Sequence, residues 1–305
     1  MKIIVTGGAG FIGAHSGRLL LSRSHEVHAV DDLSHGKREA VPAGATLHVV
    51  DVRSPAFIQL AQQLKPDAVL HLAAQMDVRK SVADPADDAS INILGTVNAL
   101  EAARRSGSRR FILASSGGAV YGEQDQFPCT ELHPRRPASP YGASKLCGEE
   151  YLLLWTRLYG FSTLALRYAN VYGPGQDPMG EAGVVAIFAG KMLKGETPTI
   201  NGDGLQTRDY VYVEDVAMAN ALALESQVTG ALNVGTGLET NVVEIAKGLA
   251  AALKLSQPSK HGPTAPGEQR RSVIDPAAIG KALGWRPTVQ LADGLARTAQ
   301  WFAKK

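Results

Sequence analysis

The chain has 305 residues, of which 45% are hydrophobic, so it is long enough to bury a large core in one domain or in two. Its 31 basic and 29 acidic residues nearly balance, and the one dense basic run, residues 104–110, falls at an expected helix end, where cations complement the helix dipole. Nucleic-acid binding is therefore not supported. With two cysteines and no His/Cys ligand spacing, neither a disulfide framework nor a metal site is expected.

The apolar stretches of the chain bear on its localisation. The run at residues 3–5 is too short for a signal peptide and is followed at once by glycines. No apolar stretch approaches the roughly 18–20 uncharged residues of a transmembrane helix. We therefore expect a soluble, cytoplasmic protein without membrane contact.

Strand-like and helix-like segments alternate through the first half of the chain. Continuous apolar strands separated by helices predict a parallel sheet covered on both faces, which is the doubly wound α/β class. The expected strands are residues 3–5, 27–30, 47–50, 68–71, 110–114 and 162–167, and the expected helices include residues 54–64, 90–105 and 141–158.

The pattern changes after Arg167. Residues 170–183 are rich in Gly and Pro and are expected to form a loop. Such a broken tail is typical of a smaller C-terminal α/β substrate-binding region on the carboxyl edge of a sheet. Helices are expected at residues 184–193, from 214 and at 241–253, and short strands near 197–201, 210–213 and 231–234. The expected division is a nucleotide-binding domain over residues 1–169, with returning segments at about 210–236, and a substrate-binding region over 170–209 and 237–305.

The first strand runs into a glycine-rich turn and then into a helix. Glycines at positions 7, 10 and 13 let the backbone turn tightly and approach a diphosphate, and the helix directs its free N–H groups at that diphosphate. About 20 residues later a second strand ends in Asp31-Asp32, where a carboxylate can bind an adenosine ribose and repel a 2′-phosphate. This order of segments predicts NAD binding. The alternative is a glycine-rich turn that holds no ligand.

Tyr141 and Lys145 are the candidate catalytic pair. Residues four apart share one helical face, so the Lys145 ammonium can lie near the Tyr141 phenol. That cation, together with a positively charged nicotinamide ring, favours the phenolate and lowers a pKa that is ordinarily about 10. A phenol tuned in this way can remove a proton from a sugar hydroxyl and return it. The alternative is a solvated pair on a helix surface.

Several motifs in chain order resemble the extended short-chain dehydrogenase/reductases, and most of all their UDP-glucose 4-epimerase-like subgroup. The resemblance runs from residue 1 to about Pro287 and implies a Rossmann-type fold. It rests on residues 6–13, 31–34, 51–52, 71–75, 92–96 and 167–174, and on the Tyr141-x-x-x-Lys145 pair.

The resemblance implies roles for individual residues. Arg208 has a further reason in its own chemistry, because a guanidinium matches phosphate oxygens bidentately; the alternative is a surface pair with Asp209. The implied cofactor-binding residues are Gly7, Gly10, Phe11, Ile12, Asp31, Asp32, Ser34, Lys37, Asp51, Val52, Leu72, Ala73, Ala74, Asn92, Tyr141, Lys145 and Tyr168. The implied substrate-binding residues are Gln75, Asn170, Val184, Thr199, Asn201, Arg208, Glu268 and Arg271.

Two positions depart from the family pattern. The family usually has a catalytic Ser or Thr three residues before the Val-Tyr-Gly that follows the fifth strand, and here that position is Gly117. Ser116 would supply this third catalytic group, a hydroxyl for the reacting sugar oxygen; otherwise the group is absent. Ala265 stands where many relatives have an Arg, and Glu268 where they have an Asp. Arg271 would then replace the missing charge on phosphate.

The resemblance implies an NAD-dependent nucleotide-sugar 4-epimerase, with UDP-glucose and UDP-galactose as the first expected pair. It implies transient oxidation of C4 to a 4-keto sugar, proton removal by Tyr141 and hydride return to either face. The alternatives are an epimerase of UDP-N-acetylglucosamine or UDP-glucuronate, another sugar-nucleotide reductase or decarboxylase, and a non-catalytic NAD-binding protein. A 4,6-dehydratase is disfavoured, because Gly118-Ala119 lacks the acid pair that elimination needs. The resemblance also implies a homodimer.

Overall fold

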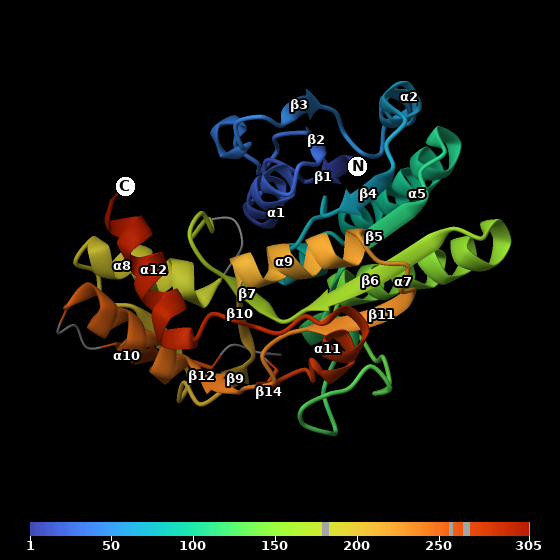
Figure 1. Ribbon diagram of the computed structural model, residues 1–305. Helices are drawn as coiled ribbons and strands as arrows, with labels where there is room; N and C mark the ends of the chain where they lie inside the picture. The colour runs from blue at the N-terminus through green and yellow to red at the C-terminus, as the bar shows by residue number, and fades with distance from the viewer. Residues whose placement is uncertain (179–182, 256–258, 265–268, 305) are drawn as a thin grey trace.

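The main body of the protein is a seven-stranded sheet with helices on both faces (Figure 1). The computed structural model describes residues 1–178, 183–255, 259–264 and 269–304. Every neighbouring pair of strands in this sheet is parallel. The order across the sheet is β11 (Gly230–Val234), β6 (Ser162–Tyr168), β5 (Arg110–Ser116), β4 (Ala68–His71), β1 (Lys2–Thr6), β2 (Glu26–Asp31) and β3 (Thr46–Val49).

Two apolar clusters cover the two faces of this sheet. Successive side chains of a strand point to opposite faces, so Ile3 and Val5 join one cluster and Ile4 joins the other. Because both faces are buried, the strands are apolar throughout, and the predicted doubly wound parallel sheet is confirmed. The helices on the first face are α1 (Phe11–Ser22) and α9 (Val213–Leu224), and those on the second are α2 (Pro55–Leu64), α5 (Gly95–Ser106) and α7 (Pro140–Tyr159).

The helix predicted over residues 90–105 has a more complex start than its sequence suggests. A short helix α4 (Pro85–Ala89) leads into a π-helical turn, η2 (Ser90–Leu94), which leads into α5. The end of α5 follows the prediction. Gly107 caps it with a φ of 80°, and Arg104 in its last turn pairs with Glu101.

A smaller region begins just beyond the carboxyl end of β6. Its first strand, β7 (Asn170–Tyr172), pairs in parallel with β10 (Tyr210–Tyr212). The loop predicted from residue 170 was therefore wrong for its first three residues, since the Tyr172 ring is buried against the rings of Tyr210 and Tyr212. Irregular backbone begins at Gly173, whose φ is 152°.

Three helices and several short strands complete the smaller region. α8 (Val184–Leu193), α10 (Val242–Leu253) and α12 (Leu291–Ala303) enclose a third apolar cluster (Figure 1). The division into cofactor and substrate regions stays a prediction. The remaining short strands are β8 (Thr199–Asn201), β9 (Thr207–Arg208), β12 (Thr240–Asn241), β13 (Lys260–Gly262) and β14 (Arg271–Ser272). The remaining short helices of the whole chain are η1 (Arg38–Ala40), α3 (Val78–Ala83), α6 (Gly117–Val120) and α11 (Ala277–Leu283).

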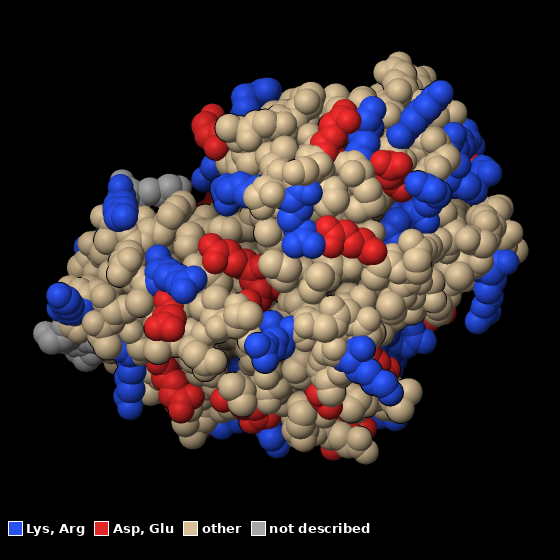
Figure 2. All heavy atoms as spheres, viewed as in Figure 1, with Lys and Arg blue, Asp and Glu red and all other residues tan. Residues whose placement is uncertain are grey.

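Acidic and basic side chains are scattered among uncharged residues over the face that Figure 2 shows. Among the helices of the described residues, none is both long and apolar enough to cross a membrane.

Candidate active site

A cavity of about 320 Å³ lies at the carboxyl ends of β1, β2, β4 and β5. Open parallel sheets bind ligands at this edge. The predicted residues that line it are Gly7, Gly10, Phe11, Ile12, Asp31, Asp32, Ser34, Asp51, Val52, Leu72, Ala73, Ala74, Gln75, Tyr141, Lys145 and Tyr168. Lining residues that the sequence analysis did not predict include Arg53, Asp87, Ile91 and Ser115.

The glycine-rich turn forms one wall of the cavity. Gly7 has a φ of 66°, and a Cβ there would lie 2.9 Å from the backbone nitrogen of Ala73. A Cβ on Gly13 would collide with the carbonyl oxygen of Gly7. Gly10, the N-cap of α1, would bring its Cβ near only that same oxygen, at 3.2 Å. The backbone is thus open at the helix N-terminus, as the diphosphate of NAD requires.

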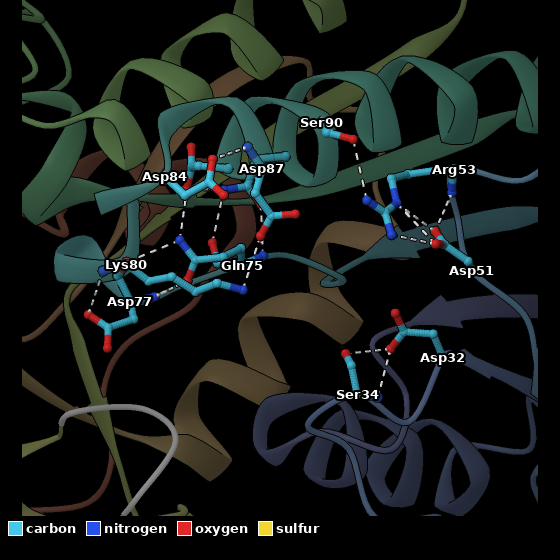
Figure 3. A network of polar contacts seen from close by, with 12 residues as sticks. Asp32, Ser34, Asp51, Arg53, Gln75, Asp77, Lys80, Asp84, Asp87 and Ser90 are labelled. Atoms are coloured by element: carbon cyan, nitrogen blue, oxygen red, sulfur yellow. Dashed lines mark hydrogen bonds and ion pairs between the residues drawn. The ribbon is translucent and has the colours of Figure 1, made fainter. Parts of the chain in front are cut away.

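Three carboxylates line the far end of the cavity. Asp31, at the end of β2, accepts hydrogen bonds from the backbone of Ala9 (3.0 Å) and Leu33 (2.9 Å), and burial raises its pKa. Asp32 accepts from the Ser34 hydroxyl at 2.6 Å, and Asp51 pairs with Arg53 at 2.7 Å (Figure 3). These acceptors suit ribose hydroxyls, and together with the glycine turn they fit NAD. Within the described residues, no group of three or more His, Cys, Asp or Glu side chains could hold a metal ion.

Two predicted cofactor residues lie outside the cavity lining. Lys37 forms an ion pair with Asp177 at 3.6 Å. Asn92, in the π turn η2, is buried and exchanges two hydrogen bonds of 2.9 Å with the backbone of Gln75. Asn92 therefore fixes the loop that lines the cavity rather than facing the cavity itself. The sequence could not show this direction of the Asn92 side chain, because a π turn has no distinct pattern of apolar residues.

Tyr141 and Lys145 lie together on one face of α7, as predicted. Pro140 occupies the first turn of the helix and Ser139 caps it by accepting from the Gly142 N–H at 3.1 Å, so Tyr141 stands at the helix start. The Lys145 Nζ lies 5.7 Å from the centre of the Tyr141 ring. It is buried and donates to the Ala114 carbonyl oxygen at 3.0 Å. Burial lowers the pKa of Lys145 to about 8.

Two serine hydroxyls lie at the carboxyl end of β5. Ser115 lines the cavity and donates to the buried Glu149 carboxylate at 2.6 Å. Ser116 ends the strand and occupies the N-cap position of α6 without a side-chain capping hydrogen bond. It lies outside the cavity lining, and its catalytic role stays a prediction. A Cβ at Gly117 would lie 2.9 Å from the Ile274 side chain. A Ser or Thr at this position would therefore require the Ile274 side chain to shift.

The predicted substrate residues other than Gln75 lie in the smaller region, outside the cavity lining as far as they are described. They come from separate elements, and their role in binding stays a prediction. Asn170 lies in β7, Val184 in α8, Thr199 and Asn201 in β8, Arg208 in β9 and Arg271 in β14, whereas Glu268 lies outside the described residues.

Arg208 and Arg271 are placed differently, although both were predicted to bind phosphate. β9 and β14 pair so that Arg208 is beside Ser272, whose hydroxyl lies 3.4 Å from where a Gly118 Cβ would be. Arg208 is thus on the strand position that faces α6, the short helix that follows β5. Arg271 is the next residue along β14 and lies beside Thr207. Its side chain forms an ion pair with Glu239 at 2.8 Å and stacks on the Phe127 ring at 3.7 Å.

Known proteins are similar to this chain over its whole length. UDP-glucose 4-epimerase of Mycolicibacterium smegmatis is 42% identical over 311 residues, covering 100% of this chain and 99% of that protein. The crystal structure of UDP-glucose 4-epimerase from Thermotoga maritima with UDP-glucose matches with a TM-score of 0.97 and 43% identity, over 100% of this chain and 99% of that one. UDP-glucose 4-epimerase of Thermus thermophilus, in complex with NAD, matches with a TM-score of 0.93 and 45% identity over 99% of each chain. Residues 3–235 match the NAD dependent epimerase/dehydratase family, and the chain belongs to that family.

Proposed function

We propose that this protein is a UDP-glucose 4-epimerase that uses NAD, the cofactor of its family. The observation that carries the proposal is the placement of Tyr141 and Lys145 on the wall of a cavity that fits NAD. Identity of 42% to UDP-glucose 4-epimerase along the whole chain supports the sugar nucleotide. The reaction interconverts UDP-glucose and UDP-galactose.

Tyr141 acts as the general base and acid of this reaction. The residues that line the cavity would hold NAD, which would supply a reversible hydride acceptor for C4 of the sugar. Tyr141 removes the proton of the 4-hydroxyl and later returns it. The buried Lys145 ammonium stabilises the phenolate, and its hydrogen bond to the Ala114 carbonyl oxygen holds it in place. Because proton and electrons both return to the sugar, no added oxidant is needed.

The smaller region supplies the groups for the UDP part of the substrate. Arg208, on the strand position that faces α6, is proposed to bind the diphosphate, since its fork of N–H donors fits two phosphate oxygens. Arg271 is proposed to act there only after leaving Glu239. The Ser116 hydroxyl is proposed to bind the reacting sugar oxygen.

Proton NMR of the anomeric region tests the reaction directly. After the protein is mixed with UDP-galactose and no added NAD, the signal of UDP-glucose is expected to grow. Tyr141→Phe should remove this turnover while NAD stays bound. Tyr151→Phe, on the same helix but partly buried against the core, is the matched control and should keep this turnover. Full turnover by Tyr141→Phe would refute the mechanism, and epimerisation of only UDP-N-acetylgalactosamine or UDP-galacturonate would refute the sugar assignment.

We further propose that the protein forms a homodimer through α5 and α7. The two helices lie side by side, with Arg104 of α5 stacked on Tyr159 of α7 at 5.0 Å. Leu158 is 60% exposed and Leu154 is 42% exposed on α7, which leaves apolar surface for a second copy to cover. Light scattering is expected to give twice the chain mass, and Leu158→Glu should give the single mass. A wild-type protein at single mass would refute the dimer.

A further inference from the structure

Asp88, near the end of α4, is a buried carboxylate that holds three parts of the active site together. Its side chain is 1% exposed. Oδ1 accepts hydrogen bonds from the side-chain amides of Gln75 (2.9 Å) and Asn92 (3.0 Å), and Oδ2 accepts from the Ser144 hydroxyl (2.6 Å). These partners come from the loop after β4, from the π turn η2 and from α7. One side chain therefore ties together three elements around the cavity.

Gln75, Asn92 and Ser144 all act as hydrogen-bond donors to the Asp88 carboxylate. The amide nitrogens of Gln75 and Asn92 can only donate, and both amide oxygens are already used. The Gln75 oxygen accepts from the Asp77 backbone at 2.6 Å (Figure 3), and the Asn92 oxygen accepts from the Gln75 backbone at 2.9 Å. A proton on Oδ1 would displace one of these two amide donors. The site is thus built around a negative charge.

Lys145 directly follows Ser144, whose hydroxyl contacts Asp88, and it is itself buried. Burial opposes its positive charge, whereas the negative charge of Asp88 acts in the opposite direction and raises the pKa of Lys145. Without a nearby anion, the buried ammonium would lose its proton at lower pH. The state of Lys145 therefore depends on Asp88.

The other ionisable side chains around Lys145 do not replace Asp88. His71 of β4 is neutral, because burial lowers its pKa to about 3. Tyr141 is the catalytic partner of Lys145. The remaining groups are already bound to others: Glu149 to Arg167, Asp87 to Lys80, and Tyr168 to Asn220. Among the described residues, Asp88 is the anion whose charge raises the pKa of Lys145.

We propose that Asp88 is a positioning residue of the active site, whose negative charge keeps Lys145 protonated and whose hydrogen bonds fix Gln75 and Asn92. The proposal rests on the proposed function, in which Lys145 acts through its positive charge. The proposed effect on Lys145 requires the negative charge of the Asp88 carboxylate. An uncharged residue of the same shape would keep the packing and lose the effect on Lys145.

The test compares Asp88→Asn with the wild-type holoenzyme. Removing the anion should move the alkaline limb of the kcat profile for UDP-galactose down by about one pH unit. In the same variant, the titration midpoint of Lys145, followed by NMR of carbon-13-labelled lysine and assigned with Lys145→Met, should fall by a similar amount. Asp84→Asn removes an exposed charge from the same helix and is the matched control that should shift neither. Asp88→Glu should restore the midpoint.

Two outcomes would overturn the proposal. The first is a lower kcat in Asp88→Asn without a shift of the alkaline limb of the kcat profile or of the Lys145 titration midpoint. That result would leave Asp88 a purely structural role. If that variant does not fold, carbon-13-labelled aspartate in the wild type decides the question. The Asp88 carboxyl must then keep the signal of a carboxylate from about pH 6 to pH 9, and titration in that range would refute the proposal. The NMR measurements need no turnover, so they test the role of Asp88 independently of the reaction. Full activity of Tyr141→Phe, by contrast, would refute the proposed function itself.

Discussion

His71 is expected to make the fold sensitive to acid, because its hydrogen bonds admit only a neutral imidazole. The Thr6 hydroxyl accepts from the backbone N–H groups of residues 72 and 73, both at 3.2 Å, so its own proton is donated to His71 Nδ1 at 2.8 Å. The Thr96 hydroxyl donates to the Asn92 carbonyl oxygen at 2.7 Å, so it accepts from His71 Nε2 at 3.2 Å. A second ring proton would have no acceptor.

The magnitude follows from the shift in pKa. Burial lowers the pKa of His71 from 6.5 to about 3. The unfolded chain therefore binds a proton below about pH 6.5 that the folded protein does not bind until about pH 3, so the stability is complete at higher pH and is lost as the pH falls. Each pH unit in that window is worth about 1.4 kcal/mol. At about pH 5 the folded state has lost about 2 kcal/mol through this one group.

Urea unfolding at about pH 8 and about pH 5 measures the effect. His71→Asn keeps an acceptor for Thr6 and cannot take up a proton. Between the two pH values the wild type is expected to lose about 2 kcal/mol more stability than this variant. His261→Asn, which changes an exposed histidine, is the control and should behave as the wild type. Equal losses in wild type and His71→Asn would refute the argument.

Two further predictions concern a buried ion pair and the glycine turn. Glu149→Gln leaves the buried Arg167 without its anion, so it is expected to cost about 3–5 kcal/mol in urea unfolding, and a cost below about 1 kcal/mol would contradict this. Glu150→Gln, which breaks an exposed pair on the same helix, should cost at most about 1 kcal/mol. Gly13→Ala places a methyl group against the carbonyl oxygen of Gly7 and should weaken NAD binding at least about tenfold. The measurement is the amount of NAD that the protein retains through gel filtration. Unchanged retention would show that the turn can adjust.

The amino-acid sequence alone determined the features of this protein that depend on local periodicity. Apolar runs placed all six expected strands of the first half in the main sheet, with ends within two residues of those observed. The glycine spacing predicted the turn at Gly7 and the open N-terminus of α1. The spacing of Tyr141 and Lys145 placed both on one helical face. Each of these follows from the geometry of a single strand, turn or helix, so no knowledge of packing was needed.

The tertiary structure alone decided which side chains from distant segments meet. Asp88 contacts Ser144, 56 residues away, and neither residue carries a local pattern that points to the other. In the structure Asn92 bonds to the Gln75 loop and Arg271 pairs with Glu239, contacts that the sequence did not reveal; their roles in binding cofactor and phosphate stay predictions. Such contacts depend on how whole elements pack, and the energy that selects them is shared among many residues. For that reason the sequence predicted the Tyr141 and Lys145 pair, whereas only the fold revealed the side chains that pack and bond around it.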